Sequence, residues 1–127
     1  MTGYSINIEE KTLQNENFRE ILYTAQHSQL VVMCLQPNED IGKEVHEIVD
    51  QFIRIEEGEG KAVLNGEEYI LSDGMAIIVP AGTEHNIINT SSGKKLKLYT
   101  VYSPAHHKDK TIHKTKRDAL VDTQDHI

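Results

Sequence analysis

Five residues with fixed spacing constrain this chain more than any other part of its sequence. They are Gly74, Pro80, Gly82, His85 and Asn89, separated in turn by five, one, two and three residues. At average amino-acid usage such a pattern arises by chance on the order of once in a few million starting points. Pro80 fixes its own φ at a strand end, and Gly82 permits a conformation that residues with a Cβ avoid. His85 then begins a returning strand, where its side chain can enter the interior of a β-barrel.

Short strand-like segments surround this pattern and indicate an all-β chain. Residues 4–8 alternate weakly, and Asn65-Gly66 between two strand-like arms is the strongest short-range signal for a hairpin. The other predicted strands cover residues 18–23, 30–35, 51–56, 75–79 and 95–103. Many short strands separated by Gly and Pro turns are typical of an antiparallel sandwich or barrel.

Side chains alternate between the two faces of each predicted strand, and this alternation places two polar side chains in the interior. Gln51 shares a face with Ile53 and Ile55, so its amide points inward and needs a hydrogen-bond partner. Tyr102 shares a face with Leu98, so its hydroxyl can overhang a pocket or its ring can pack in the core. Asn89 is expected to tie a turn through side-chain-to-backbone hydrogen bonds.

The spaced pattern resembles the second signature of the cupin superfamily. The first cupin signature has two histidines one residue apart, a glutamate four or five residues later and a glycine seven beyond that. Anchored on Gly58, this sequence has Gln51 at the glutamate position, His46 at the second histidine and Glu44 at the first. The chain is similar to small bacterial cupins labelled mannose-6-phosphate isomerase-like.

The resemblance implies a double-stranded, jelly-roll-like β-barrel over residues 30–103. Residues 1–29 are expected to form N-terminal strands that pack on this barrel, and the polar composition after Pro104 indicates a C-terminal tail over residues 104–127. The resemblance also implies a central metal site, for which the candidate ligands are Glu44, His46, Gln51 and His85.

The charge of these four candidates is compatible with a metal ion. A typical cupin set of three histidines and one glutamate carries one negative charge, and so does this set. The carboxylate has moved to Glu44, and the amide oxygen of Gln51 would be the weakest ligand. The set remains acceptable to Zn, Ni, Mn, Fe or Co.

The cupin fold hosts many activities, so the resemblance leaves three functions open. The first is a metal enzyme acting on a small polar molecule, such as a sugar or sugar-phosphate isomerase-like activity. The second is a non-catalytic module that binds or senses a small molecule. The third is an iron-dependent dioxygenase, which is disfavoured because only two imidazoles remain in the candidate set. With Glu44 assigned to the metal, the inward-facing candidates for acid–base chemistry reduce to Tyr102 and the tail histidines.

The tail carries His106, His107, His113 and His126, and a helical turn or two is expected around residues 114–121. A solvated surface extension is the favoured interpretation. The alternative is that residues 105–113 fold back and close the mouth of the barrel, because they directly follow the strand that ends near Tyr102.

Composition limits the partners of the chain. A net charge of −7 argues against nucleic acid or an anionic membrane surface, and no apolar run approaches the ~20 residues of a membrane span. The lone cysteine, Cys34, lies in an apolar run typical of a buried core residue, and a cytoplasmic location is expected.

Phe52 lies on the face opposite the pocket, so we expect a homodimer formed partly by the N-terminal strands and partly by one outer sheet face.

Overall fold

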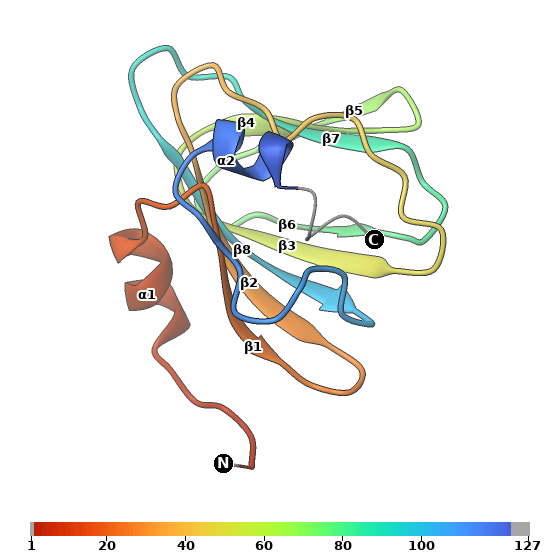
Figure 1. The fold of residues 1–127 in the computed structure, drawn as a ribbon. Coiled ribbons are helices and arrows are strands. Elements are labelled where there is room, and N and C mark those ends of the chain that lie inside the picture. The colour runs from red at the N-terminus through yellow and green to blue at the C-terminus, as the bar shows by residue number, and fades with distance from the viewer. Residues whose placement is uncertain (1, 123–127) are drawn as a thin grey trace.

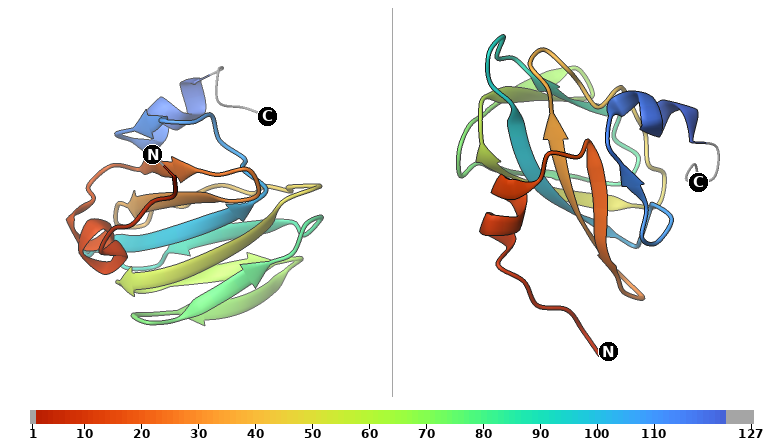
Figure 2. Two further views of the ribbon diagram at one scale, coloured as in Figure 1. Left: turned by 90° about the horizontal axis from the view of Figure 1, so that it is seen from below. Right: turned by 60° about the vertical axis from the view of Figure 1, so that its left-hand side comes forward.

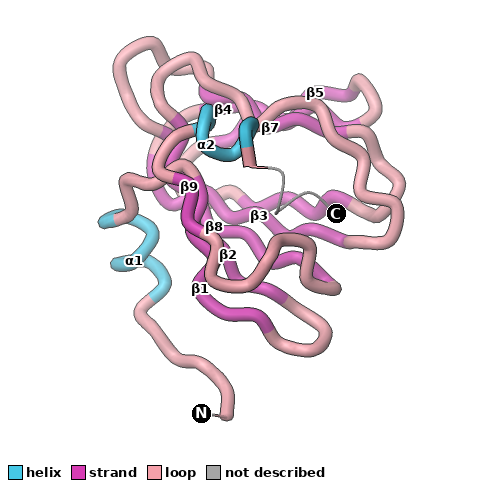
Figure 3. Tube along the Cα trace, in the orientation of Figure 1, coloured by secondary structure: helices cyan, strands magenta, loops and turns pink. Residues whose placement is uncertain are grey.

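The computed structural model describes residues 2–122 and contains two antiparallel β-sheets (Figures 1 and 3). The elements in chain order are α1 (Ile8–Gln14), β1 (Arg19–Thr24), β2 (Gln29–Leu35), β3 (Asp50–Glu57), β4 (Gly60–Leu64), β5 (Glu67–Leu71), β6 (Ala76–Val79), β7 (His85–Asn89), β8 (Leu96–Ser103), β9 (Ile112–His113) and α2 (Lys116–Val121). One sheet has the strand order β6-β3-β8-β2-β1-β9 and the other β5-β4-β7. The prediction of an all-β, jelly-roll-like fold is confirmed. None of the helices within residues 2–122 has the length and apolar character needed to cross a membrane.

Two rows of side chains, one apolar and one polar, run across neighbouring strands of the six-stranded sheet and face the interior. Ile55, Leu98 and Met33 lie opposite one another on adjacent strands and are completely buried. Near one end of the same face, Gln51 lies opposite Tyr102, which lies opposite Gln29. The inward orientation predicted for Gln51 and Tyr102 is therefore confirmed, since each is only 3% exposed. This polar row marks the end of the fold where a site can form.

The predicted hairpin joins β4 to β5. Asn65 and Gly66 form its turn with φ values of 49° and 84°, the positive angles that a two-residue turn of this type requires. β4 also pairs with β7, which places His85 opposite Leu64. The hairpin therefore fixes the sheet from which the histidine of the spaced pattern projects.

The prediction of a strand over residues 4–8 is wrong. Helix α1 begins at Ile8, and the side chain of Asn7 accepts a hydrogen bond of 3.0 Å from the Glu10 amide. An asparagine N-cap followed by acidic residues in the first turn is a helix-start signal, and it outweighs weak alternation. At its other end the helix is held to β8, because the Lys97 ammonium donates to the Leu13 carbonyl.

The interpretation of the tail as a solvated extension is also wrong. After β8 the chain folds back, and β9 pairs with β1 so that His113 lies opposite Arg19. The predicted helical turns exist as α2, which follows β9 at one edge of the six-stranded sheet (Figure 2). His107 and His113 are 7% and 3% exposed, values that a solvated tail does not have. His126 lies outside the described residues.

An apolar row crosses the outer face of the six-stranded sheet and gives the expected homodimer a physical basis. It consists of Ile78, Phe52, Val101, Leu30 and Tyr23, each opposite the next on neighbouring strands. Ile78, on an edge strand, is 57% exposed. The other four are partly buried, and a contiguous, partly exposed apolar row of this kind is compatible with an interaction site. The dimer itself stays a prediction.

Substitution of Ile78 tests that prediction. Ile78→Glu places a charge in the apolar row and is expected to convert a dimer into a monomer of 14.4 kDa, measured by light scattering at micromolar concentration. Ile70→Glu is the matched control, because Ile70 is 74% exposed but lies on the other sheet. A wild-type mass of 14.4 kDa, or equal masses for both variants, would contradict this interface.

Candidate metal centre

The loop of residues 41–46 is part of the connection between β2 and β3 and is held against β7 of the opposite sheet. Glu44 and His85 exchange two backbone hydrogen bonds of 2.9 Å, so their side chains project on the same side. The Gly82 amide donates to the His46 carbonyl at 2.8 Å, and Gly82 has a φ of +83° that favours glycine. The Pro-x-Gly corner of the spaced pattern therefore positions His46 as well as His85.

Asn89, the last residue of the spaced pattern, has a structural role. Its amide nitrogen donates to the carbonyls of Leu35, Gln36 and Lys94, and its oxygen accepts from the Ser91 amide at 2.9 Å. The side chain is 1% exposed. The prediction that Asn89 ties a turn rather than contacting a ligand is confirmed.

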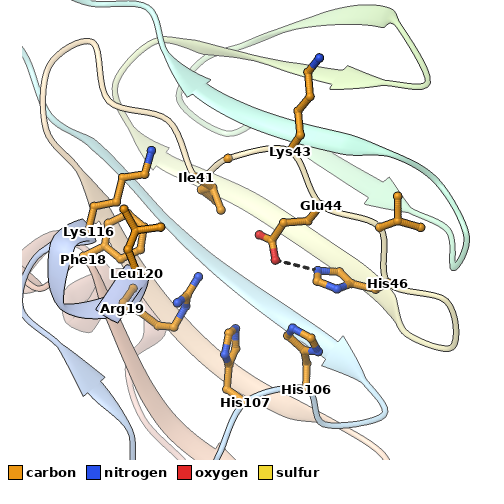
Figure 4. Close-up of a pocket in the computed structure, with 13 residues that line it drawn as sticks. Phe18, Arg19, Ile41, Lys43, Glu44, His46, His106, His107, Lys116 and Leu120 are labelled. Atoms are coloured by element: carbon orange, nitrogen blue, oxygen red, sulfur yellow. Dashed lines mark ion pairs between the residues drawn. The ribbon is translucent and has the colours of Figure 1, made fainter. Parts of the chain in front are cut away.

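Glu44, His46 and His106 form the most compact group of potential metal ligands among the described residues. One ligand atom from each lies within 4.8 Å of the others. The Nε2 atom of His46 is 3.8 Å from a carboxylate oxygen of Glu44, and the rings of His46 and His106 have centroids 4.2 Å apart (Figure 4). Ligand atoms bound tetrahedrally at ~2.1 Å stand about 3.4 Å apart, so modest side-chain movement would bring these three to one ion.

His85 lies next to this group but outside it. Its ring centroid is 5.0 Å from that of His46, and its side chain is 5% exposed. The Nδ1 atom is 2.9 Å from the Thr83 carbonyl, which can only accept. Nδ1 therefore carries the proton, and Nε2 keeps its lone pair available to a metal.

Gln51 is held by one end of its amide only. Nε2 donates to the Thr100 hydroxyl at 3.0 Å, whereas Oε1 is buried and has no hydrogen-bond partner within the described part of the chain. A buried polar atom without a partner is costly and calls for an explanation such as an ion or a water molecule. An unsatisfied amide oxygen is compatible with the ligand role predicted for Gln51.

Four donors were thus predicted, and the structure groups them unequally. It places Glu44 and His46 together, leaves His85 beside them and orients Gln51 inward. It adds His106, which the sequence suggested only through the alternative that the tail closes the barrel. The assignment of Glu44, His46, Gln51 and His85 as one ligand set stays a prediction.

Gln29 holds the backbone of two tail histidines in place, a role that no local pattern in the sequence indicates. Its side-chain oxygen accepts from the amides of His106 and His107 at 3.2 and 2.9 Å. Its nitrogen donates to the His107 carbonyl at 2.7 Å and to the Thr24 hydroxyl at 3.0 Å. With no exposed surface, Gln29 fixes the backbone from which His106 reaches His46.

Tyr102 lies between the tail and the candidate ligands. Its ring meets the His46 ring nearly edge-on, with centroids 6.1 Å apart, and its hydroxyl is 3.3 Å from Nε2 of His107. Tyr102 therefore does more than fill the core, and it stays a candidate for a catalytic group.

Burial keeps the central imidazole neutral. The pKa of His46 is lowered from its ordinary 6.5, chiefly by desolvation and further by His85 and His107, whereas the nearby Glu44 carboxylate opposes the shift. An imidazole must be neutral to bind a metal, so this environment favours ligation at neutral pH. Between its lowered pKa and 6.5 the unfolded chain binds the extra proton, and His46 therefore reduces stability as the pH falls through that window.

A cavity of about 380 Å³ opens beside the candidate ligands. Its walls come from the start of β1, the loop of residues 41–46, the tail and α2 (Figure 4). Glu44, His46 and His106 face it from one side, and Arg19 and Lys116 line the other. The volume lies near the lower end of the ~300–1,000 Å³ range of small-molecule pockets. The arrangement offers a small molecule access to the candidate metal position.

Comparison with known proteins agrees with this architecture. YrkC of Bacillus subtilis strain 168 is 46% identical over 124 residues, which cover 92% of this chain and 66% of YrkC. A protein of Acanthamoeba polyphaga mimivirus is 48% identical over 107 residues, or 82% of this chain and 67% of that protein. The chain thus spans about two thirds of the length of these two relatives.

A solved structure and a domain family also match this chain. The crystal structure of BH2720 from Bacillus halodurans shares 40% sequence identity, covers 94% of both chains and superposes with a TM-score of 0.91. The cupin domain family matches residues 31–102, which contain both signatures and every strand from β3 to β7. The chain belongs to the cupin superfamily.

Proposed function

We propose that this cupin binds one divalent transition metal through Glu44, His46, His85 and His106 and acts on a small polar molecule. The proposal is carried by the close approach of Glu44, His46 and His106, whose ligand atoms lie within 4.8 Å of one another. His85 is the fourth donor because its ring adjoins His46 and its Nε2 is unprotonated. Three neutral imidazoles and one carboxylate suit Zn, Ni, Mn, Fe and Co.

This donor set explains the altered first signature. Glu44 stands where cupins commonly have a histidine, and Gln51 stands at the glutamate position. With His106 supplied by the tail, the site again has three imidazoles and one carboxylate, with the same net charge. Gln51 then acts as a weak additional donor or as a hydrogen-bond partner of a metal-bound water.

A metal in such a site acts as a Lewis acid that polarises a carbonyl or hydroxyl oxygen of the bound molecule. The protein contributes the cavity beside the ligands and a buried Tyr102–His107 pair, whose hydroxyl and imidazole are 3.3 Å apart. That pair supports an enzyme over a purely sensing module, because it offers a proton-transfer group near the ligands. Isomerase-like activity on a sugar or sugar phosphate is the specific reaction that the sequence resemblance favours.

One observation supports an iron-dependent dioxygenase as a second candidate. The sequence disfavoured it for lack of a third imidazole, and the approach of His106 to His46 removes that objection. Oxygen uptake by the Fe(II)-loaded protein, measured with small candidate substrates, separates the two activities.

The two adjacent tail histidines provide a matched test of the ligand set. Removing a group that only supports a ligand costs about 10–100-fold in metal affinity, so His106→Ala, which removes a direct ligand, should cost at least tenfold. His107→Ala is the control, because His107 lies farther along the same segment and its Nε2 faces Tyr102. Metal affinity is measured by competition with a chromophoric chelator, after circular dichroism has shown that both variants fold. Equal affinities in the two variants would remove His106 from the ligand set.

A further inference from the structure

Arg19 places a permanent positive charge inside the fold. It is the first residue of β1 and lies opposite Met33, in the same inward-facing row as the fully buried Leu98. Only 7% of Arg19 is exposed, yet it lines the cavity on the side opposite Glu44 and His46 (Figure 4). A buried arginine is rare unless a partner compensates its charge.

No carboxylate within residues 2–122 forms an ion pair with the Arg19 guanidinium, and its buried Nε has no hydrogen-bond partner there. One terminal nitrogen lies 3.4 Å from Nδ1 of His113. Nε2 of His113 lies 2.8 Å from an Asp122 carboxylate oxygen, so Nε2 carries the proton and Nδ1 accepts from Arg19. An imidazole carries no negative charge, so His113 orients the guanidinium without compensating its charge. The stack on Phe18, 5.2 Å from ring to guanidinium carbon, also leaves the charge in place.

The other cations around the cavity are in a different situation. The Lys116 ammonium is paired with Asp40, and Lys43 is exposed to solvent. Arg19 is therefore the cation that combines burial with the lack of a carboxylate partner among the described residues. This combination is expected of a residue whose counter-ion is a ligand.

We infer that the cavity binds a small organic acid whose carboxylate pairs with Arg19 while another oxygen of the same molecule reaches the metal position. This inference rests on the proposed function and narrows its small polar molecule to an acid, in place of the sugar or sugar phosphate that the sequence resemblance favours. The planar guanidinium fork matches the two oxygens of a carboxylate. Phosphate, with more charge and three oxygens to satisfy, is matched less well by a single buried fork that shares its cavity with Glu44. The volume of about 380 Å³ limits the acid to a small one.

Succinate serves as the probe, with uncharged succinamide and inorganic phosphate for comparison, titrated calorimetrically into metal-loaded protein. Wild type is expected to bind succinate more tightly than either comparison compound. Arg19→Gln should weaken succinate binding about 10- to 100-fold, the equivalent of one hydrogen bond to a charged group. Arg19→Lys keeps the positive charge but loses the planar fork, so its succinate affinity should lie between those of wild type and Arg19→Gln. Lys61→Gln is the control for net charge, because Lys61 pairs with Glu68 on the outer hairpin and should leave succinate affinity unchanged.

Two further readouts separate this role from a structural one and from the metal site. Ligand-free Arg19→Gln should unfold at the same temperature as wild type or higher, because an uncompensated buried charge has been removed. The metal content of Arg19→Gln should equal that of wild type. In chelator-treated wild type, succinate should still bind weakly, and this binding should depend on Arg19. Absence of metal from wild type would contradict the proposed function alone. Equal succinate affinity in wild type and Arg19→Gln, tighter binding of phosphate or succinamide, or a lower unfolding temperature for Arg19→Gln would overturn this inference.

Discussion

His46→Ala is expected to reduce the metal content from one ion per chain to nearly none. His46 is the residue on which the other candidate donors converge, since Glu44, His85 and His106 all lie next to it. Its burial keeps the imidazole neutral, so in wild type it is available as a donor at neutral pH. Elemental analysis after reconstitution and desalting measures the effect.

The matched control for this prediction is His27→Ala, because His27 is exposed in the turn between β1 and β2. Its metal content should equal that of wild type. His46→Ala should keep its circular-dichroism spectrum, since the apolar core does not include that imidazole. If His46→Ala retained a full equivalent of metal, the ligand set proposed above would be wrong.

Gln29→Ala is expected to destabilise the protein by at least about 2 kcal/mol, because the amides of His106 and His107 and the His107 carbonyl would lose their partner inside the fold. For a chain of this size that corresponds to a fall of roughly 8 °C or more in the unfolding temperature. Metal affinity should fall as well, because His106 would no longer be held against His46. Thermal unfolding and chelator competition measure the two effects.

Gln14→Ala provides the control for the same change of residue type. The Gln14 side chain is exposed on α1 and, among residues 2–122, bonds only to Glu10 one turn earlier, so its loss should alter stability by no more than about 0.5 kcal/mol. If Gln29→Ala matched Gln14→Ala in both measurements, the tail would not depend on Gln29 for its position.

The strands could be predicted because their signals are local. The alternation that placed Gln51 with Ile53 and the Asn65-Gly66 turn each depend on neighbours a few residues away. The same parity argument applies to Arg19, which shares a face with buried Ile21, and it could have identified a charge inside the fold.

The remaining features depend on contacts between distant parts of the chain. His106 approaches His46 although it lies 60 positions later in the chain, and the backbone of His106 is held there by Gln29. Hydrophobic periodicity contains no information about such polar long-range contacts, so a polar tail resembles a solvated one. Helix α1 is a different case, because its Asn7 cap was a readable signal that weak alternation obscured.

Anomalous diffraction from crystals of the zinc-reconstituted protein, measured at the zinc absorption edge, locates a bound ion independently of activity. One strong peak per chain is expected, bounded by the side chains of Glu44, His46, His85 and His106. The absence of a peak at this position, or a peak only at exposed residues such as His27, would contradict the proposed ligand set.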